Sequence, residues 1–537
     1  MSASYPLTRH LGGGSSGSAP LRLLSPTRSD AATDPYWLTD QMLFHYQRCP
    51  RRAFLDRYGD RSLRDAPSDY LQKLKQDSAD HRKQILADYQ PLHSPHYPFR
   101  DWRAGAIATA ALMQQGVDYI GQGVLIAETA TNVVLVSNPD LLIRMPGESI
   151  WGDWQYIPAD IKFGKKPKLD YQMVAAFHAL VLMDGQGTWP AASWLILREG
   201  KSYAIDLDKQ LTRLDELLYA CIEDLQDSEP PEVFIAHSRC DLCHWFSQCH
   251  SQAKATKHLS LLPGVTPARY VHLQRLQLTT VAALATARPE QLSSLPGFGE
   301  QVAEKIVHQA QSVLNDTAIA RVSVHTARFP LTPETLPSAA VELYFDIEAA
   351  PDKQLIYLHG VLVVDKVANT ETFHPLLAEH PEQEAEAWAA FVMLMQQHPT
   401  APVYHFCPYE AQTVRRLAAE FGLPEGADVD RLLDRFVDVH KCFTDAVTLP
   451  TESYALKHIA RWIGFDWRDA DANGAQSICW YDDWLTTGDR QYLTAILRYN
   501  EDDCRATYQI KEWLVNFAQP FWDQDGGNDV DARADEV

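Results

Sequence analysis

Two carboxylates and a lysine in the N-terminal half have a spacing that suits metal-assisted hydrolysis. Asp140 follows Pro139 directly, and Asp160 and Lys162 stand two residues apart twenty positions later. Side chains two residues apart on a strand share a face, so Asp160 and Lys162 are expected to point together. Two carboxylates can hold a magnesium ion that polarises a phosphate and helps to generate hydroxide, and a lysine can orient the attacking water or stabilise negative charge.

Two further polar residues extend this candidate site. His81, on a segment expected to be helical, could be another metal ligand, and Gln172, which opens the following helix, could position the substrate or Lys162. The alternative is a pair of ordinary surface acids beside a packing histidine, because the acid-x-Lys pattern is frequent by chance. The residues resemble the RecB-like branch of the PD-(D/E)xK nuclease superfamily. This resemblance implies a restriction-endonuclease-like α/β fold, Mg²⁺ or Mn²⁺, catalytic roles for Asp140, Asp160, Lys162 and Gln172, and metal ligation by His81, Asp140 and Asp160.

Four cysteines flank these residues. Cys240, Cys243 and Cys249 lie in one turn-rich segment, and Cys49 supplies a fourth thiol from the other end of the same region. Four thiolates suit a 4Fe-4S cluster or a structural zinc, and four unrelated buried cysteines are the alternative. The order and the Cys-x-x-Cys-x5-Cys spacing resemble the iron-sulfur clasp of AddB and of CRISPR-associated RecB-like nucleases, which favours 4Fe-4S over zinc. The other thiols lack such spacing and are expected in the core or on the surface: Cys221, Cys407, Cys442, Cys479 and Cys504.

A glycine-containing turn follows in a locally basic segment. Residues 251–330 contain eight Lys and Arg against four Asp and Glu, and Leu295–Gly299 reads Leu-Pro-Gly-Phe-Gly before a helix. It resembles a helix-hairpin-helix motif, in which Gly297 and Gly299 would let backbone N–H groups approach a nucleic-acid phosphate. Leu262–Val265 could open a related, weaker unit. A simple tight turn, or a degenerate hairpin that only joins domains, is the alternative.

A second group of acids lies near the C-terminus. Asp346 and Glu348 share one face of an alternating strand, and Tyr499 and Asp503 stand four apart on an expected helix, so each pair projects together. The pattern resembles RNase H-like, DnaQ-type DEDD exonucleases that end in Tyr-x-x-x-Asp. The resemblance implies that Asp346, Glu348 and Asp503 bind two metals and that Tyr499 orients the attacking water.

The middle motif departs from that family. Glu410 stands where aspartate is usual, and its extra methylene moves the carboxylate oxygen. Glu410 is nevertheless predicted to be catalytic, Asp438 is the remaining ligand candidate, and Lys457 is placed near phosphate by resemblance. Asp502 is expected to face solvent. The alternative is an RNase H-like fold retained for binding, with catalysis lost.

The elements that must hold these residues define the expected fold class, an α/β multidomain chain. Strands are expected at 123–127, 133–136, 157–163 and 193–198, and a helix at 70–90. The predicted parts are a flexible tail (1–34), a RecB-like nuclease domain with the four-cysteine cluster (35–254), an all-α helix-hairpin-helix domain (255–325), a linker (326–338), an RNase H-like exonuclease domain (339–522) and an acidic, disordered tail (523–537).

Composition limits the function classes. The 537 residues carry a formal net charge of −22, which argues against coating nucleic acid through bulk electrostatics but not against a nuclease with a local basic surface. No apolar run reaches membrane-spanning length and no secretory signal is evident, so we expect a cytoplasmic protein with no membrane partner.

The order of parts resembles bacterial RecB-family nucleases with a C-terminal exonuclease domain. We therefore expect a metal-dependent DNA nuclease, acting as an exonuclease on single-stranded ends in DNA repair or recombination. The alternative is a nucleic-acid-binding adaptor of a repair or CRISPR-type complex with one or both sites inactive. The Gly164-Lys165 pair lacks the rest of a phosphate-binding loop, so unwinding would need a partner such as a helicase.

Overall fold

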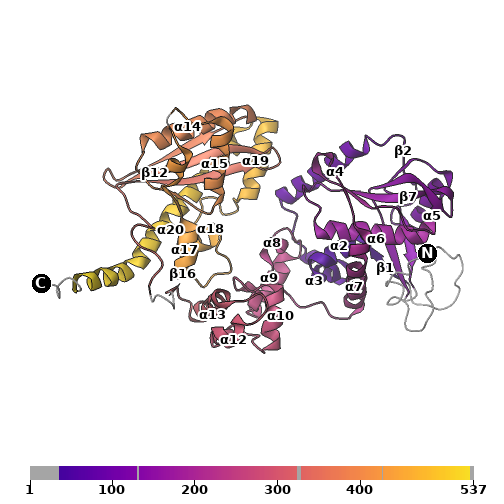
Figure 1. The fold of residues 1–537 in the computed structure, drawn as a ribbon, viewed down its shortest axis with the longest axis horizontal. Coiled ribbons are helices and arrows are strands. Elements are labelled where there is room, and N and C mark those ends of the chain that lie inside the picture. The colour runs from indigo at the N-terminus through magenta and orange to yellow at the C-terminus, as the bar shows by residue number, and fades with distance from the viewer. Residues whose placement is uncertain (1–34, 130–131, 323–327, 426, 532–537) are drawn as a thin grey trace. The chain divides into compact units, whose positions relative to one another are not determined.

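The computed structural model describes residues 35–129, 132–322, 328–425 and 427–531 (Figure 1). The chain divides into two compact units. The first runs to Val233 and also takes in His237–Ser251, and the second comprises Phe234–Ala236 and the chain from Gln252 onward. The predicted tail over residues 1–34 lies outside the described residues, as do the last six positions, 532–537.

The first unit contains two sheets and a central helix. The larger sheet has the order β2-β3-β6-β7-β8-β9, and the smaller has the order β1-β5-β4. Helix α6 (Leu169–Gln186) packs against strands of both sheets, and it is buried nearly all round because most of its residues are apolar. The strands are β1 (Tyr36–Thr39), β2 (Leu92–His93), β3 (Tyr119–Gly121), β4 (Leu125–Glu128), β5 (Val133–Ser137), β6 (Leu141–Ser149), β7 (Gly152–Ile161), β8 (Trp194–Ile196) and β9 (Ser202–Ala204).

Helices surround these sheets and carry several predicted site residues. Helix α4 (Asp69–Leu86) covers most of the segment predicted to be helical at 70–90, and α2 (Asp40–Arg48) follows β1 directly. Cys49 separates α2 from α3 (Pro50–Tyr58), where the proline starts a new helix at its first position. The other helices of this unit are α5 (Trp102–Gln115), α7 (Leu207–Gln226) and α8 (His237–Cys240), and α9 (Phe246–Ala255) begins in this unit and ends in the second.

The predicted strands of the first unit overlap observed strands, but one boundary matters for the site. Strand β7 ends at Ile161, so Lys162 lies one residue beyond it, although its N–H still bonds to the Ile196 carbonyl at 2.8 Å. Asp140 occupies the connection between β5 and β6, and the β6–β7 hairpin pairs Leu141 with Ala159. The hairpin register therefore brings Asp140 beside Asp160.

The second unit begins with a cluster of short helices around a small apolar core. Its helices are α10 (Pro267–Arg275), α11 (Val281–Ala285), α12 (Pro289–Ser293) and α13 (Glu300–Asn315). Leu273, Leu284, Leu292 and Ile306 form the centre of this core. Strand β10 (Ile319–Ala320) then pairs antiparallel with β16 (Val447–Thr448), which joins these helices to the remainder of the unit.

A five-stranded sheet of order β13-β12-β11-β14-β15 forms the rest of the second unit. Along β11 (Val341–Ala350), Leu343, Phe345 and Ile347 pack with α14 and α15, whereas Tyr344 packs with α20 on the opposite face. The other strands are β12 (Leu355–Asp365), β13 (Thr370–Leu377), β14 (Val403–His405) and β15 (Phe436–Asp438). The helices are α14 (Glu384–Gln397), α15 (Tyr409–Phe421), α16 (Val429–Leu433), α17 (Val439–Ala446), α18 (Leu456–Trp462), α19 (Gly474–Thr487) and α20 (Arg490–Asp531).

Two expectations about this unit were wrong. Asp502 does not face solvent: it is 3% exposed, and its carboxylate accepts hydrogen bonds from the Arg468 backbone N–H at 2.9 Å and Nε at 2.7 Å. The acidic C-terminal segment does not lose structure at 523, because α20 continues to Asp531. Within the part of the chain that the structure describes, no helix is both long enough and apolar enough to cross a membrane.

Candidate functional sites

The hairpin in the first unit brings the predicted acids and lysine together. The Asp140 Oδ2 atom accepts a hydrogen bond from the Ile161 N–H at 2.8 Å, and its Oδ1 atom pairs with Arg82 Nε at 2.8 Å. The Lys162 Nζ atom lies 3.0 Å from Asp160 Oδ2. Both carboxylates are buried, so these contacts fix their orientation.

Two residues not foreseen from the sequence complete this cluster. His178 on α6 places its Nε2 atom 3.2 Å from Asp160 Oδ1 and 3.8 Å from Asp40 Oδ2. Its Nδ1 atom lies 2.7 Å from Ser137 Oγ. The sequence signal for His178 was a histidine inside an otherwise apolar helical segment, whereas Asp40, between Thr39 and Gln41, gave no comparable signal.

The charges of this cluster depend on one another. Burial raises the pKa of Asp140, and the nearby Asp160 charge adds to that effect. Burial also opposes ionisation of Asp160, but Lys162 and His178 outweigh it and hold its pKa below the usual value. Burial alone would lower the pKa of Lys162, yet Asp160 and Asp140 raise it. Asp160 and Lys162 are thus a stable ion pair at neutral pH.

His81 and Gln172 make their described contacts elsewhere. The His81 ring lies 5.7 Å from the Phe163 ring, and burial together with Arg198 lowers its pKa, which favours the neutral imidazole. Gln172 donates to the Pro167 carbonyl at 2.7 Å and accepts from Gln210 at 3.0 Å. A metal-ligand role for His81 and a catalytic role for Gln172 stay predictions.

The cysteines predicted as a clasp lie near one another. Cys243 donates its N–H to the Cys240 carbonyl at 2.9 Å, and Cys49 interacts electrostatically with both Cys243 and Cys249. All four are free thiols. Burial raises the pKa of Cys243 and Cys249, while the Trp245 N–H and Arg52 at Cys243, and Arg51 at Cys249, favour the thiolate. Four sulfur donors are the right type of ligand for a thiolate-bound metal centre. Their sulfur atoms are not gathered into one here, because among the described residues only Asp346, Glu348 and Asp503 bring three ligand atoms within 4.8 Å of one another.

Hydrogen bonds to one carboxylate also hold the cysteine-bearing segment in place. Asp56 on α3 accepts hydrogen bonds from His244 Nε2 at 2.6 Å and Trp245 Nε1 at 2.9 Å, both of which lie between Cys243 and Cys249. His45 also contacts the Asp56 carboxylate at 2.9 Å. Asp56 therefore connects the segment around Cys49 to the segment around Cys243 and Cys249 without any metal.

The hairpin before α13 has the backbone shape expected of a phosphate-binding turn. Gly297 and Gly299 have φ values of 80° and 69°, and a Cβ at either position would meet nothing within 4 Å. The turn is therefore left-handed at both glycines and open to solvent. Arg269 donates to the Gly297 and Gly264 carbonyls at 2.7 Å each, so one side chain ties this turn to the related Leu262–Val265 turn.

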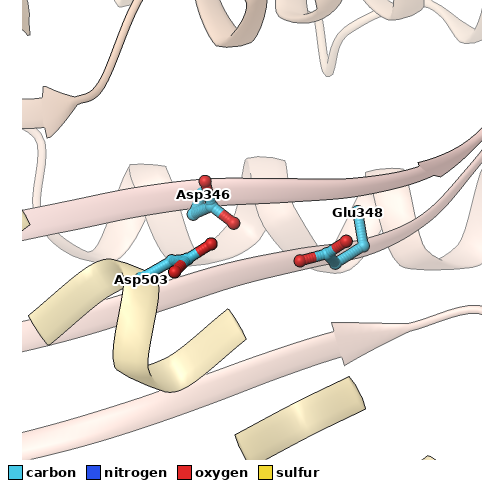
Figure 2. A group of neighbouring side chains, drawn as sticks. All are labelled: Asp346, Glu348 and Asp503. Atoms are coloured by element: carbon cyan, nitrogen blue, oxygen red, sulfur yellow. The ribbon is translucent and has the colours of Figure 1, made fainter. Parts of the chain in front are cut away.

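Three acids converge at the sheet of the second unit. Asp346 and Glu348 from β11 and Asp503 from α20 place one carboxylate oxygen each within 4.8 Å of the other two, in an arrangement that could hold a metal ion (Figure 2). Asn500 donates to Asp346 Oδ2 at 2.6 Å, and Trp467 Nε1 donates to Asp503 Oδ1 at 2.6 Å. Neutral donors thus orient two of the carboxylates without neutralising them.

The electrostatics of this acidic cluster favour a cation. Burial raises the pKa of Glu348 to about 8, and the Asp503 charge adds to the shift. Burial likewise raises the pKa of Asp503 to about 7, although Trp467 and Tyr499 lower it through hydrogen bonds. Burial and the other carboxylates raise the pKa of Asp346 well above its usual value. Such repulsion is relieved when a divalent cation binds.

The other predicted residues of this site take different positions. Tyr499 hydrogen-bonds to Asp503, and Glu410 is close enough to Asp346 to raise its pKa. The Glu410 Oε2 atom lies 3.4 Å from His405 Nδ1. Asp438 instead caps α17, where it accepts from the Lys441 N–H at 2.9 Å.

Sequence reasoning missed the residues that seat Asp346. Gly360 on β12 pairs opposite Asp346, and a Cβ at Gly360 would lie 1.5 Å from Asn500 Oδ1. Only glycine therefore leaves room for Asn500 to reach Asp346. The Asn500 position, one residue after Tyr499, was the available signal, but its partner lies on a distant strand.

Comparisons with known families agree with the second unit. Residues 343–515 match the model of the RNase H superfamily, and residues 256–312 match the model of a SAM-like helix-hairpin-helix tandem. No curated protein matches the chain. The predicted RNase H-like fold and the all-α helix-hairpin-helix segment are confirmed within a mixed α/β multidomain chain, and together they indicate nucleic-acid binding and a hydrolase of the nuclease type.

Proposed function

We propose that this protein is a metal-dependent DNA nuclease that trims single-stranded ends, with its main catalytic site in the RNase H-like domain. The observation that carries the proposal is the convergence of Asp346, Glu348 and Asp503 within 4.8 Å, two of them buried. Buried acids that repel one another are costly unless a cation joins them, so their convergence at one point of the sheet favours metal binding.

At this site Asp346, Glu348 and Asp503 would hold Mg²⁺ or Mn²⁺, and Glu410 is a further catalytic candidate. The bound metal would supply phosphate polarisation and a nucleophile at neutral pH. Tyr499 hydrogen-bonds to Asp503 and is proposed to orient the attacking water. The Lys457 Nζ atom lies 5.2 Å from the Tyr499 ring and 5.1 Å from the Trp467 ring, and it donates to the Ala472 carbonyl. Its charge lowers the pKa of Asp503, so Lys457 is proposed to contact the phosphate beside that carboxylate.

The region 35–254 is proposed as a second, RecB-like nuclease domain. Asp140 and Asp160 would be its metal ligands, and Lys162 would stabilise the charge that develops on the phosphate. The support is geometric: the three side chains lie on one hairpin and its continuation, and the two acids are buried. Metal binding here requires Arg82 to release Asp140 Oδ1, because that atom is paired at 2.8 Å.

Cys49, Cys240, Cys243 and Cys249 are proposed to bind a 4Fe-4S cluster that ties the two ends of this domain together. Burial raises the pKa of the Cys243 and Cys249 thiols, and the nearby Arg52 and Arg51 offset part of that shift, so a bound metal would supply the rest of the stabilisation of the thiolates. The helix-hairpin-helix tandem, with Gly297 and Gly299 at its open turn, is proposed to hold the nucleic-acid backbone without reading sequence.

A second candidate function is a nucleic-acid-binding adaptor in which one or both nuclease sites are inactive, the first site above all. One observation favours it: in the described structure Asp140 is paired with Arg82, and Asp160 with Lys162 and His178. Three acids, including Asp40, face three basic side chains. Such a cluster is balanced without a metal, unlike the acids around Asp346.

Cleavage of labelled DNA separates these functions. The full chain is incubated with Mg²⁺ or Mn²⁺ and with single-stranded or duplex DNA labelled at either end. We expect Asp346→Asn to remove the main activity and Lys162→Ala to remove a second component. Asp430→Asn and Lys441→Ala, which change exposed charges in salt bridges, serve as controls that keep activity. Wild-type protein that binds DNA but leaves it intact with both metals would support the adaptor.

A further inference from the structure

A strongly basic loop connects Lys162 to helix α6. Lys162, Lys165, Lys166 and Lys168 fall within seven residues of a chain whose formal net charge is −22. Lys165, Lys166 and Lys168 are exposed. A Cβ at Gly164 would lie 3.3 Å from the Tyr171 ring, so the loop runs along the edge of that ring. Clustered lysines beside an aromatic ring are typical of surfaces that follow a phosphate backbone.

Tyr171 is stacked on a second aromatic residue, Phe44. The two ring centroids are 6.1 Å apart, with an angle of 15° between the ring planes. Phe44 comes from α2 and Tyr171 from α6. Two neighbours of Phe44 on α2, Leu43 and Tyr46, are buried in the core. Phe44 itself is half-buried and belongs to none of the hydrophobic clusters formed by the described residues. Tyr171 packs against a small buried cluster, so one ring of the pair is anchored in the core and Phe44 lies outside it.

Cations surround this aromatic pair. The Nζ atoms of Lys162 and Lys168 each lie 5.9 Å from the Tyr171 ring centroid, and Arg48 Cζ lies 5.4 Å from the Phe44 ring centroid. Arg48 is exposed. An exposed guanidinium and a nucleobase are alternative planar partners for an aromatic ring, so Arg48 can give way to a base and then contact its phosphate.

We propose that Phe44, Tyr171 and Arg48 form a stacking site for one unpaired nucleobase, with the lysine loop binding the adjoining phosphates. The stacking site lies beside Lys162, so its place next to the scissile bond rests on the proposed function of the first site. Only a base that is not paired can lie on the rings. The site therefore selects single-stranded nucleic acid for this unit.

Binding in EDTA tests the stacking site apart from cleavage. The full chain is titrated with a fluorescent single-stranded oligonucleotide that is either intact or has one abasic position, moved along the strand. Wild-type protein should bind about 5- to 100-fold more weakly when the abasic position reaches the rings. Phe44→Ala should weaken binding of the intact strand by a similar factor and should no longer distinguish the abasic strand.

Two controls keep the test decisive. Phe44→Leu retains apolar volume and should fold like the wild type, as checked by thermal unfolding, yet lose the base dependence. Phe99→Ala removes another phenylalanine covered by an arginine, with Arg100 Cζ 5.1 Å from the ring centroid, and should leave binding unchanged. Equal base dependence in wild type and both Phe44 variants would overturn the stacking site, even if DNA is cleaved. A base-dependent loss in a protein that never cleaves DNA would instead overturn the nuclease proposal and keep the stacking site.

Discussion

Because of the buried acids of the RNase H-like domain, the stability of the protein should fall as pH rises and should increase when a divalent metal binds. The folded pKa of Glu348 is raised from 4.5 to about 8. The folded state therefore keeps a proton that the unfolded chain has already lost, and the stability that this proton provides disappears as pH rises through 8. In EDTA the protein should be more stable near pH 5 than near pH 9.

The expected size follows from the same shift. A tenfold change in proton affinity corresponds to about 1.36 kcal/mol, so ionising Glu348 costs at most about 5 kcal/mol. Asp503 titrates in the same range, with its pKa raised to about 7, so the two acids lose their protons as a coupled pair. We expect a loss of about 2 to 5 kcal/mol, which for a domain of this size lowers Tm by about 4 to 20 °C.

Thermal unfolding measures this in EDTA, Mg²⁺ and Mn²⁺ from pH 5.5 to pH 9. Metal should raise Tm little at pH 5.5 and strongly at pH 8.5, because its ligands must release protons first. Glu348→Gln should flatten the EDTA profile and remove the metal effect. Glu382→Gln, an exposed glutamate of the same domain, should leave both unchanged. Metal stabilisation that is equal at pH 5.5 and pH 8.5, or identical EDTA profiles for wild type and Glu348→Gln, would refute the reasoning.

Three further changes test how the sites are supported. Gly360→Ala places a methyl group where Asn500 Oδ1 lies, so it should destabilise the domain by about 1–3 kcal/mol and reduce stabilisation by metal. The same unfolding assay measures both effects. An unchanged Tm and an unchanged metal response would show that Asn500 does not need the space left by Gly360. Asp56→Asn weakens the contacts to His244 and Trp245. The iron-sulfur cluster proposed for the four cysteines should then be present at lower occupancy and be lost faster to a chelator, whereas the exposed Asp60→Asn should match the wild type. Arg269→Gln removes the hydrogen bonds to the Gly264 and Gly297 carbonyls, so it should weaken DNA binding about fivefold or more in a binding titration. Arg275→Gln on the same helix should leave binding unchanged. Equal affinities of the two variants would show that the hairpins keep their shape without Arg269.

The sequence was informative where a periodic pattern carried the chemistry. The alternation along β11 placed Asp346 and Glu348 on one face, and helical spacing placed Tyr499 with Asp503. These relations are local, so the backbone period decides them. The Pro-Gly turn before α13 was readable for the same reason, because few residues other than glycine adopt its left-handed conformation.

Contacts between distant segments were not readable. His178 meets Asp160 and Asp40 only because α6 packs beside both sheets, and Asn500 reaches Asp346 only because position 360 lacks a side chain. Asp502 was expected in solvent because acids on a helix usually are, yet Arg468 covers it from a preceding loop. In each case tertiary packing, rather than local pattern, decides the role.

The strand pairing between β10 and β16 has a practical consequence for dividing this chain into pieces. Gln309 on α13 also donates to the Leu449 carbonyl at 2.5 Å and accepts from the Tyr454 hydroxyl at 2.9 Å. A recombinant fragment that begins at residue 339 would lack both Gln309 and β10. The loop after β16 would then lose these hydrogen-bond partners, and the edge of β16 would be exposed. A fragment meant to contain the RNase H-like domain should therefore begin no later than Gln252, so that the whole tandem is retained as its N-terminal support.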